Sequence, residues 1–139
     1  MNSLSLLLVF LTLNIAMAAS PFVGSWNLVQ IYSENMTPES LPDGSYHFKI
    51  EEEDPEHLHL NIQVGNSMSS SVTLLKRGES DASQQVTIGG VRSTTMMPPD
   101  SQFKLETYLS NTLPKITSMT RVDDTLILEG EGKIVCQLN

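Results

Sequence analysis

Two histidines and two glutamates occupy positions from which they could hold a metal ion. His57 and His59 alternate along one polar strand face, and Glu51 and Glu53 alternate along the preceding strand. If a loop of residues 54–56 joins the strands, Glu53 faces His57 and Glu51 faces His59. Imidazoles and carboxylates are ligands that zinc and copper accept. A solvated face with paired charges is the favoured interpretation, so no metal and no other cofactor is expected.

Motifs of the common hydrolases and phosphate-binding enzymes are missing from the sequence. There is no Gly-x-Ser-x-Gly, no His-Glu-x-x-His and no Gly-rich phosphate loop. The acidic run at residues 51–56 lacks the alternating ligands and central Gly of an EF-hand, which favours a hairpin tip. The serine-rich run at residues 67–71 has no recognisable base partner and is interpreted as the start of a strand. No catalytic residue is predicted.

The composition restricts the class of protein further. The chain has 139 residues, with 16 acidic and 8 basic side chains and a formal net charge of −8. This length suits one domain, and the acidic balance argues against a nucleic-acid partner, which needs a basic footprint. The only cysteine, Cys136, excludes an internal disulfide framework. The run of residues 133–138 predicts a strand in which Ile134, Cys136 and Leu138 share a buried face.

The first residues have the pattern of a secretory signal peptide. An apolar run at residues 4–15 ends in Ala16, Met17 and Ala18, and small residues at these spacings suit signal peptidase. We therefore expect cleavage after Ala18, a mature domain over residues 19–139 with no membrane span, and a secreted or secretory-pathway location; an uncleaved anchor is the alternative. Asn35 begins the only N-glycosylation sequon, although the proline after the sequon disfavours modification.

The mature chain reads as a series of short strands separated by turns. Strands are predicted near residues 26–31, 46–51, 57–64, 72–75, 85–88, 119–122, 125–128 and 133–136. In the hairpin around residues 54–56, the polar faces should pair Lys49 with Asn61 and His47 with Gln63, in addition to the pairs above. Strands at this spacing, joined by short turns, indicate an antiparallel sheet or barrel.

One helix interrupts the strands late in the chain. Asp100 is the expected N-cap, and Leu105, Tyr108, Leu109 and Leu113 follow at helical spacing. The neighbouring Glu106 is placed off this apolar stripe, and a proline at position 114 limits the helix. The predicted fold is therefore α+β: a compact, mainly antiparallel sheet or barrel-like domain with one helix at about residues 100–112.

Residues 86–99 read Val-Thr-Ile-Gly-Gly-Val-Arg-Ser-Thr-Thr-Met-Met-Pro-Pro and lead into the predicted helix. This run resembles the core signature of the META domain, the family of bacterial heat-shock-type META proteins and their protozoan relatives. In that family a strand runs into Ser-Thr-x-Met-x-x-Pro, followed by a helix bearing Leu-Glu. Residues 22–29, 65–69 and 124–128 resemble further family segments, in order. The resemblance implicates the motif residues Gly24, Trp26, Ser93, Thr94, Met96, Pro98, Pro99, Leu105 and Glu106.

The resemblance implies a domain with no established enzymatic activity that acts by binding an unidentified protein. Protozoan relatives are associated with virulence and secretion, and bacterial ones with envelope stress, which implies a role in envelope or host interaction. Met97 stands where bacterial members often carry Cys, so a redox role does not transfer.

Two other classes of protein remain open. A calycin-type carrier of a small hydrophobic ligand also begins with Gly-x-Trp, here Gly24 and Trp26, and would enclose a cavity of several hundred Å3. A secreted protease inhibitor would instead present a rigid loop at residues 96–100. The sequence does not specify the oligomeric state.

Overall fold

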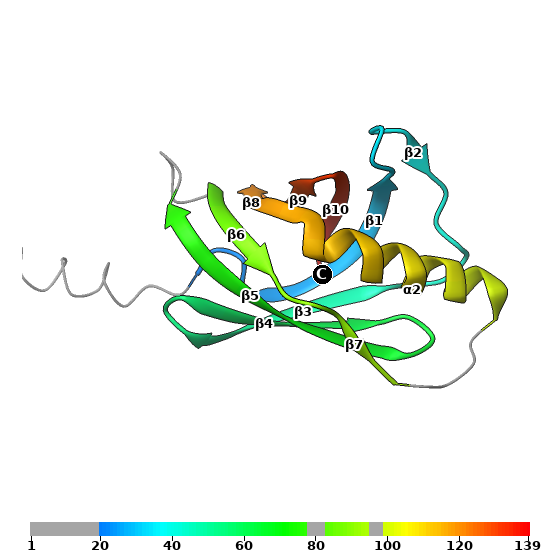
Figure 1. Cartoon of the computed structure of the whole chain (residues 1–139), viewed down its shortest axis with the longest axis horizontal. Coiled ribbons are helices and arrows are strands. Elements are labelled where there is room, and N and C mark those ends of the chain that lie inside the picture. The colour runs from blue at the N-terminus through cyan, green and yellow to red at the C-terminus, as the bar shows by residue number, and fades with distance from the viewer. Residues whose placement is uncertain (1–19, 78–82, 95–98) are drawn as a thin grey trace, which may run out of the picture.

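The computed structural model describes residues 20–77, 83–94 and 99–139. The signal peptide expected at residues 1–18 and the motif residues Met96 and Pro98 lie outside these ranges. The described elements (Figure 1) are, in order, β1 (Gly24–Tyr32), β2 (Pro38–Glu39), β3 (His47–Asp54), β4 (His57–Gln63), β5 (Ser67–Arg77), β6 (Ser83–Ile88), β7 (Arg92–Ser93), α2 (Asp100–Thr112), the 3-10 helix η1 (Leu113–Lys115), β8 (Ile116–Val122), β9 (Thr125–Gly130) and β10 (Gly132–Leu138).

The long strands form one closed antiparallel barrel. Each neighbour pair in the order β1, β3, β4, β5, β6, β8, β9, β10 is hydrogen-bonded, and β10 returns to pair with β1. The short strands β2 and β7 add to β1 and β5. Closure leaves no edge along the main strands. The barrel-like prediction is therefore confirmed, while the α+β label fits only loosely, because a single helix accompanies the barrel.

Alternation of apolar and polar residues explains which side of each strand faces inward. On β3 and β4 the even-numbered apolar residues are buried, among them Phe48, Ile50, Leu58 and Leu60, and the odd-numbered residues between them face outward. Period-two alternation of this kind is the pattern of a strand with one buried face. The apolar residues of the other strands complete a core inside the barrel.

The predicted β3–β4 register is right over most of its length. Three predicted pairs are confirmed: His47–Gln63, Lys49–Asn61 and Glu51–His59. The predicted pair of Glu53 with His57 is wrong, because a bulge between Glu52 and Asp54 makes Asp54 the partner of His57. A bulge places one extra residue on one strand and shifts the pairing beyond it.

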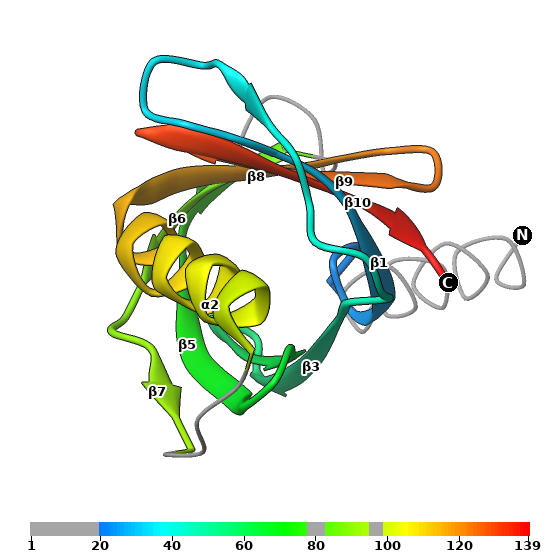
Figure 2. The same ribbon diagram turned by 90° about the vertical axis from the view of Figure 1, so that its right-hand side faces the viewer.

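Helix α2 lies across one opening of the strand ring (Figure 2). It covers Asp100–Thr112, as predicted, and Leu105 and Leu109 are buried against the core. The expected N-cap is wrong: Pro99 holds that position without a side-chain cap bond, and Asp100 is the first helical residue. There its carboxylate still suits the positive end of the helix dipole.

The opposite end of the barrel is closed by the segment before β1. Phe22 and Trp26 are fully buried, and the Trp26 indole donates a hydrogen bond to the Phe22 carbonyl oxygen (Nε1–O 2.9 Å). Arg121 lies 5.2 Å from the centroid of the Trp26 ring and donates to the Pro21 carbonyl oxygen at 2.9 Å. The motif residue Trp26 thus has a packing role.

The last strand carries the only cysteine into the core. Ile134 and Cys136 are buried as predicted, but Leu138 is 37% exposed, because it lies at the rim of the barrel, opposite Trp26. Burial raises the pKa of the Cys136 thiol. A thiol that stays protonated is a poor nucleophile and metal ligand, so Cys136 acts as a small core residue.

Candidate functional site

The polar strand face that was weighed as a metal site consists of separate pairs. His57 Nδ1 lies 2.8 Å from Asp54 Oδ1, and His59 Nδ1 lies 3.4 Å from Glu53 Oε1, while Glu51 faces Lys49 at 3.4 Å. Within the described ranges, no group of three or more His, Cys, Asp or Glu side chains could hold a metal ion. We call Glu53, Asp54, His57 and His59 the hairpin tip.

Hydrogen bonding at the hairpin tip alters the ionisation of its residues. The hydrogen bond that the His57 imidazole donates to the Asp54 carboxylate raises the pKa of His57 above 6.5. The Glu56 backbone N–H and the His57 imidazole in turn lower the pKa of Asp54 below 3.8. Each partner therefore favours the charged form of the other.

A buried hydrogen-bond network connects three segments that are far apart in the sequence: α2, the β4–β5 connection and the end of β7. Glu106 was placed off the apolar stripe, but it is only 7% exposed, because α2 packs this side against the β4–β5 connection. Its carboxylate oxygens accept hydrogen bonds from the Asn66 backbone N–H and from the Asn66 side-chain amide, each at 2.8 Å. The bonds to Glu106 therefore fix the helix to this connection.

Thr94 extends the network to the end of β7. Its hydroxyl donates to Asn66 Oδ1 at 2.8 Å and accepts from the Ser67 backbone N–H at 3.2 Å. The Thr94 N–H also donates to the Ser67 carbonyl oxygen at 3.1 Å. We call Thr94, Asn66 and Glu106 the motif network. Sequence reasoning singled out each segment but missed their contact, which needed the three-dimensional path of the chain.

The remaining described motif residues have local structural roles. Gly24 has a φ of 148°, a backbone conformation that other residues rarely adopt. The Ser93 hydroxyl donates to the Thr94 carbonyl oxygen at 3.2 Å, and Pro99 precedes the helix. In the described part of the molecule, the motif thus supports the fold, and none of its residues forms a nucleophile–base pair.

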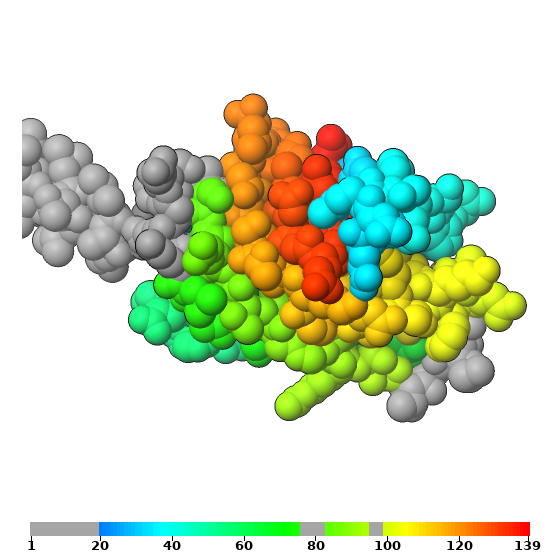
Figure 3. Space-filling model, turned by 45° about the horizontal axis from the view of Figure 1, so that its top comes forward, coloured from blue at the N-terminus to red at the C-terminus, as the bar shows by residue number. Residues whose placement is uncertain are grey.

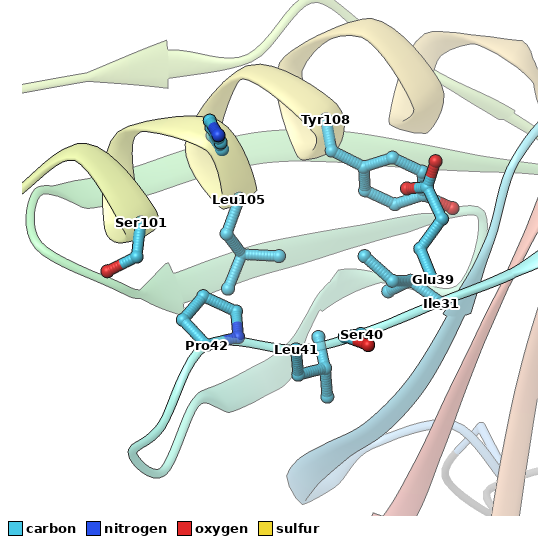
Figure 4. A pocket seen from close by; sticks show the side chains of 9 residues that line it. Ile31, Glu39, Ser40, Leu41, Pro42, Ser101, Leu105 and Tyr108 are labelled. Carbon is cyan, nitrogen blue, oxygen red and sulfur yellow. The ribbon is translucent and has the colours of Figure 1, made fainter.

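The candidate binding site is a pocket beside α2, which we call the helix pocket. It has a volume of about 360 Å3 and lies between α2 and the segment that follows β1 (Figure 4). The space-filling view shows that segment, in cyan, beside the yellow helix at one end of the molecule (Figure 3). The apolar walls are Ile31, Leu41, Pro42, Leu105 and the ring of Tyr108, and the polar residues are Glu39, Ser40, Ser101 and Lys104.

Tyr108 is held rigidly at one end of the helix pocket. Its hydroxyl donates to the Tyr32 carbonyl oxygen at 2.6 Å and lies 3.2 Å from that of Lys133. Burial raises the pKa of Tyr108 above 10.0, so the hydroxyl remains protonated at neutral pH. Tyr108 therefore contributes a fixed aromatic wall.

Two opposite charges border the helix pocket. The Glu39 carboxylate lies beside the Tyr108 ring (Figure 4), and Lys104 borders the pocket from α2. Neither side chain forms an ion pair with another described residue. An apolar floor with a few polar groups around it is the usual composition of a binding pocket.

Fold and site together define a small β-barrel protein with a helix across one opening and a pocket beside that helix. The profile of the META domain matches residues 20–138. The chain therefore belongs to the META domain family, as the motif resemblance predicted.

Solved structures share the fold at low identity. The NMR structure of a protein from Burkholderia xenovorans is 17% identical, with a TM-score of 0.63 over 84% of this chain and 81% of that one. A second NMR structure is 16% identical, with a TM-score of 0.55 over 88% of this chain and 96% of that one. No curated protein matches. In the ranges that the structure describes, no helix is long and apolar enough to cross a membrane.

Proposed function

We propose that this META domain is a non-catalytic protein-binding domain of the secretory pathway, and that its partner binds at the helix pocket. The carrying observation is the apolar hollow of about 360 Å3 beside α2. Protein interfaces concentrate their binding energy where an anchor side chain fills such a pocket. The motif network supports this proposal indirectly, because its polar groups are occupied in holding α2 in place.

The charges around the pocket specify the chemistry of the partner. Glu39 and Lys104 each lack an ion-pair partner among the described residues, so each can pair with a group of the ligand. The net charge of −8 favours approach of a basic segment. We therefore expect a peptide segment with a large apolar side chain for the pocket floor and a neighbouring Lys or Arg that faces Glu39.

A peptide-display selection on the folded domain tests this proposal. Selected peptides should combine an apolar anchor with a basic residue and should bind the wild-type protein. Ser101→Trp fills the pocket from α2 and should abolish binding, while Ser110→Trp, also exposed on α2 but away from the pocket, should leave binding unchanged. Peptides that bind Ser101→Trp as well as wild type would contradict the proposal.

The second candidate function is a calycin-type carrier of a small hydrophobic ligand. The specific observation in its favour is the pocket volume, which falls at the lower end of ordinary ligand sites. Titration with 1-anilinonaphthalene-8-sulfonate separates the two functions. Saturable binding that Ser101→Trp removes, without any peptide selected by display, would favour the carrier.

The inhibitor alternative and the secretory location each have their own test. The loop at residues 96–100 falls largely outside the described residues, so protease inhibition is to be tested by enzyme assay.

Expression in a secreting host followed by N-terminal sequencing should give Ala19 as the first residue. Asn35 lies exposed in the turn between β1 and β2, and a mobility shift on glycosidase treatment would show that it is modified.

A further inference from the structure

A second hollow, of about 380 Å3, lies on the outer wall of the barrel, away from the helix pocket. We propose that it binds a phosphate or sulfate monoester of a small polyhydroxylated molecule, a function beyond the protein binding proposed above. We call it the wall pocket, and its lining includes His59, Ser69, Ser71, Gly90 and Arg92.

The strand register brings these residues together from separate parts of the chain. Ser71 of β5 pairs with His59 of β4, and Ser69 of β5 pairs with Arg92 of β7. Directly opposed residues of an antiparallel pair have Cβ atoms about 5 Å apart. The members of these two pairs therefore lie close together across β4, β5 and β7. Figure 1 shows that the chain leaves β6 and runs on as β7 beside β5.

Arg92 supplies the positive charge. Its side chain is exposed and forms no ion pair within the part of the chain that the structure describes. A guanidinium group binds phosphate and sulfate oxygens with two parallel hydrogen bonds. Glu53 is the only carboxylate residue among those that line the wall pocket, and it faces His59, 3.4 Å from Nδ1.

Two glycines keep the hollow open. A Cβ atom added to Gly90 would meet nothing within 4 Å, so the space beside this residue is free. The neighbouring Gly89 is fixed: its N–H donates to the Ser71 carbonyl oxygen at 2.9 Å, and its own carbonyl oxygen accepts from the Ser70 hydroxyl at 2.8 Å. The free space beside Gly90 belongs to the hollow, and a side chain at position 90 would occupy part of it.

The size of the hollow indicates more than a bare anion. A volume of about 380 Å3 falls in the range of small-molecule sites and exceeds what one phosphate group needs. The hydroxyls of Ser69 and Ser71 form no hydrogen bond with other described residues. These hydroxyls can donate to and accept from the hydroxyls of a sugar or polyol, while Arg92 binds the charged group.

Isothermal titration calorimetry of the full domain tests the proposal with glucose 6-phosphate, glucose 6-sulfate, glucose and inorganic phosphate. We expect at least one of the two esters to bind with a Kd of about 1 mM or lower, and about tenfold more tightly than either glucose or inorganic phosphate. Which of the two esters binds more tightly distinguishes phosphate from sulfate.

Variants decide whether binding occurs at the wall pocket. Arg92→Gln should weaken ester binding about tenfold, and Gly90→Val should weaken it as well by placing a branched side chain in the hollow. Lys115→Gln removes an exposed cation that lines neither pocket and should have no effect. Circular dichroism checks that each variant is folded. The proposal is overturned if neither ester binds, if glucose or inorganic phosphate binds as tightly as the esters, or if both Arg92→Gln and Gly90→Val bind like wild type.

Discussion

The motif network and the hairpin tip are both polar clusters, but they differ in burial and in hydrogen bonding. Glu106 of the motif network is buried, and both of its carboxylate oxygens accept hydrogen bonds from Asn66. His57 of the hairpin tip is half-exposed and pairs with Asp54, three residues earlier in the chain. The residue types at the hairpin tip suggested a possible metal site. The burial of Glu106 indicates instead that the motif network contributes more to the stability of the fold.

The physical reason is the cost of an unsatisfied polar group. A buried donor that loses its partner has no water to replace it, which costs about 1–3 kcal/mol. An exposed pair that is broken is simply solvated, and such pairs contribute little. The two clusters should therefore respond very differently to the loss of one side chain.

The largest effect is expected for Glu106→Ala. This change removes the two carboxylate oxygens that accept hydrogen bonds from the Asn66 N–H and side-chain amide. It should lower the free energy of unfolding by about 3 kcal/mol, as measured by urea denaturation. The matched control is Glu131→Ala, because the Glu131 side chain is exposed and makes only a long ion pair, with 3.8 Å between its carboxylate and Lys115 Nζ. Equal stability of the two variants would remove the distinction between the clusters.

A smaller effect is expected for Thr94→Val, which keeps the shape of the side chain but removes its hydroxyl. The loss of the bonds to Asn66 and from Ser67 should cost about 1 kcal/mol in urea denaturation. Thr87→Val is the control, because Thr87 faces outward on β6 and is exposed. A Thr94→Val variant as stable as its control would show that Thr94 does not anchor β7.

The smallest effect on stability is expected at the hairpin tip, where Asp54→Asn should leave the urea midpoint near pH 7 unchanged within error. The change should still be visible in an NMR titration. The wild-type His57 pKa should exceed 6.5 because of the hydrogen bond to Asp54, and Asp54→Asn should return it toward 6.5. Glu34→Gln, which removes a distant carboxylate paired with Lys115, should not move it.

The sign of the pH dependence follows from both shifts. The folded-state pKa of His57 is raised above 6.5. Its contribution to folding stability is therefore fully present below pH 6.5 and is lost as the pH rises through the raised pKa. The folded-state pKa of Asp54 is lowered. Its contribution to folding stability is therefore present above pH 3.8 and is lost as the pH falls through the lowered pKa. A His57 titration that is identical in wild type and Asp54→Asn would contradict the pairing.

Local patterns predicted much of this fold because they depend on neighbouring residues. Period-two alternation located the main strands, and the helix stripe with its proline limit gave Asp100–Thr112. The bulge at Glu52–Asp54 escaped prediction, because a bulge changes the pairing without changing the alternation before it. The burial of Glu106 escaped as well, because it depends on where α2 packs against the β4–β5 connection.

The candidate site was less predictable than the fold. The walls of the helix pocket come from β1, from the segment after β2 and from α2, and no spacing in the sequence relates Leu41 to Leu105. Trp26 could be identified as a core residue from its strand, but its contact with Arg121 depends on barrel closure. A pocket made by distant segments becomes visible only when the chain is folded.

The central claim is that the motif network builds the domain and that the partner binds at the helix pocket. The most direct test is an NMR titration of the isotope-labelled domain with a peptide selected by display. We expect the largest amide shifts in residues 39–41 and 101–108, with His57 and His59 unaffected. Shifts concentrated at the hairpin tip, with none along α2, would contradict it.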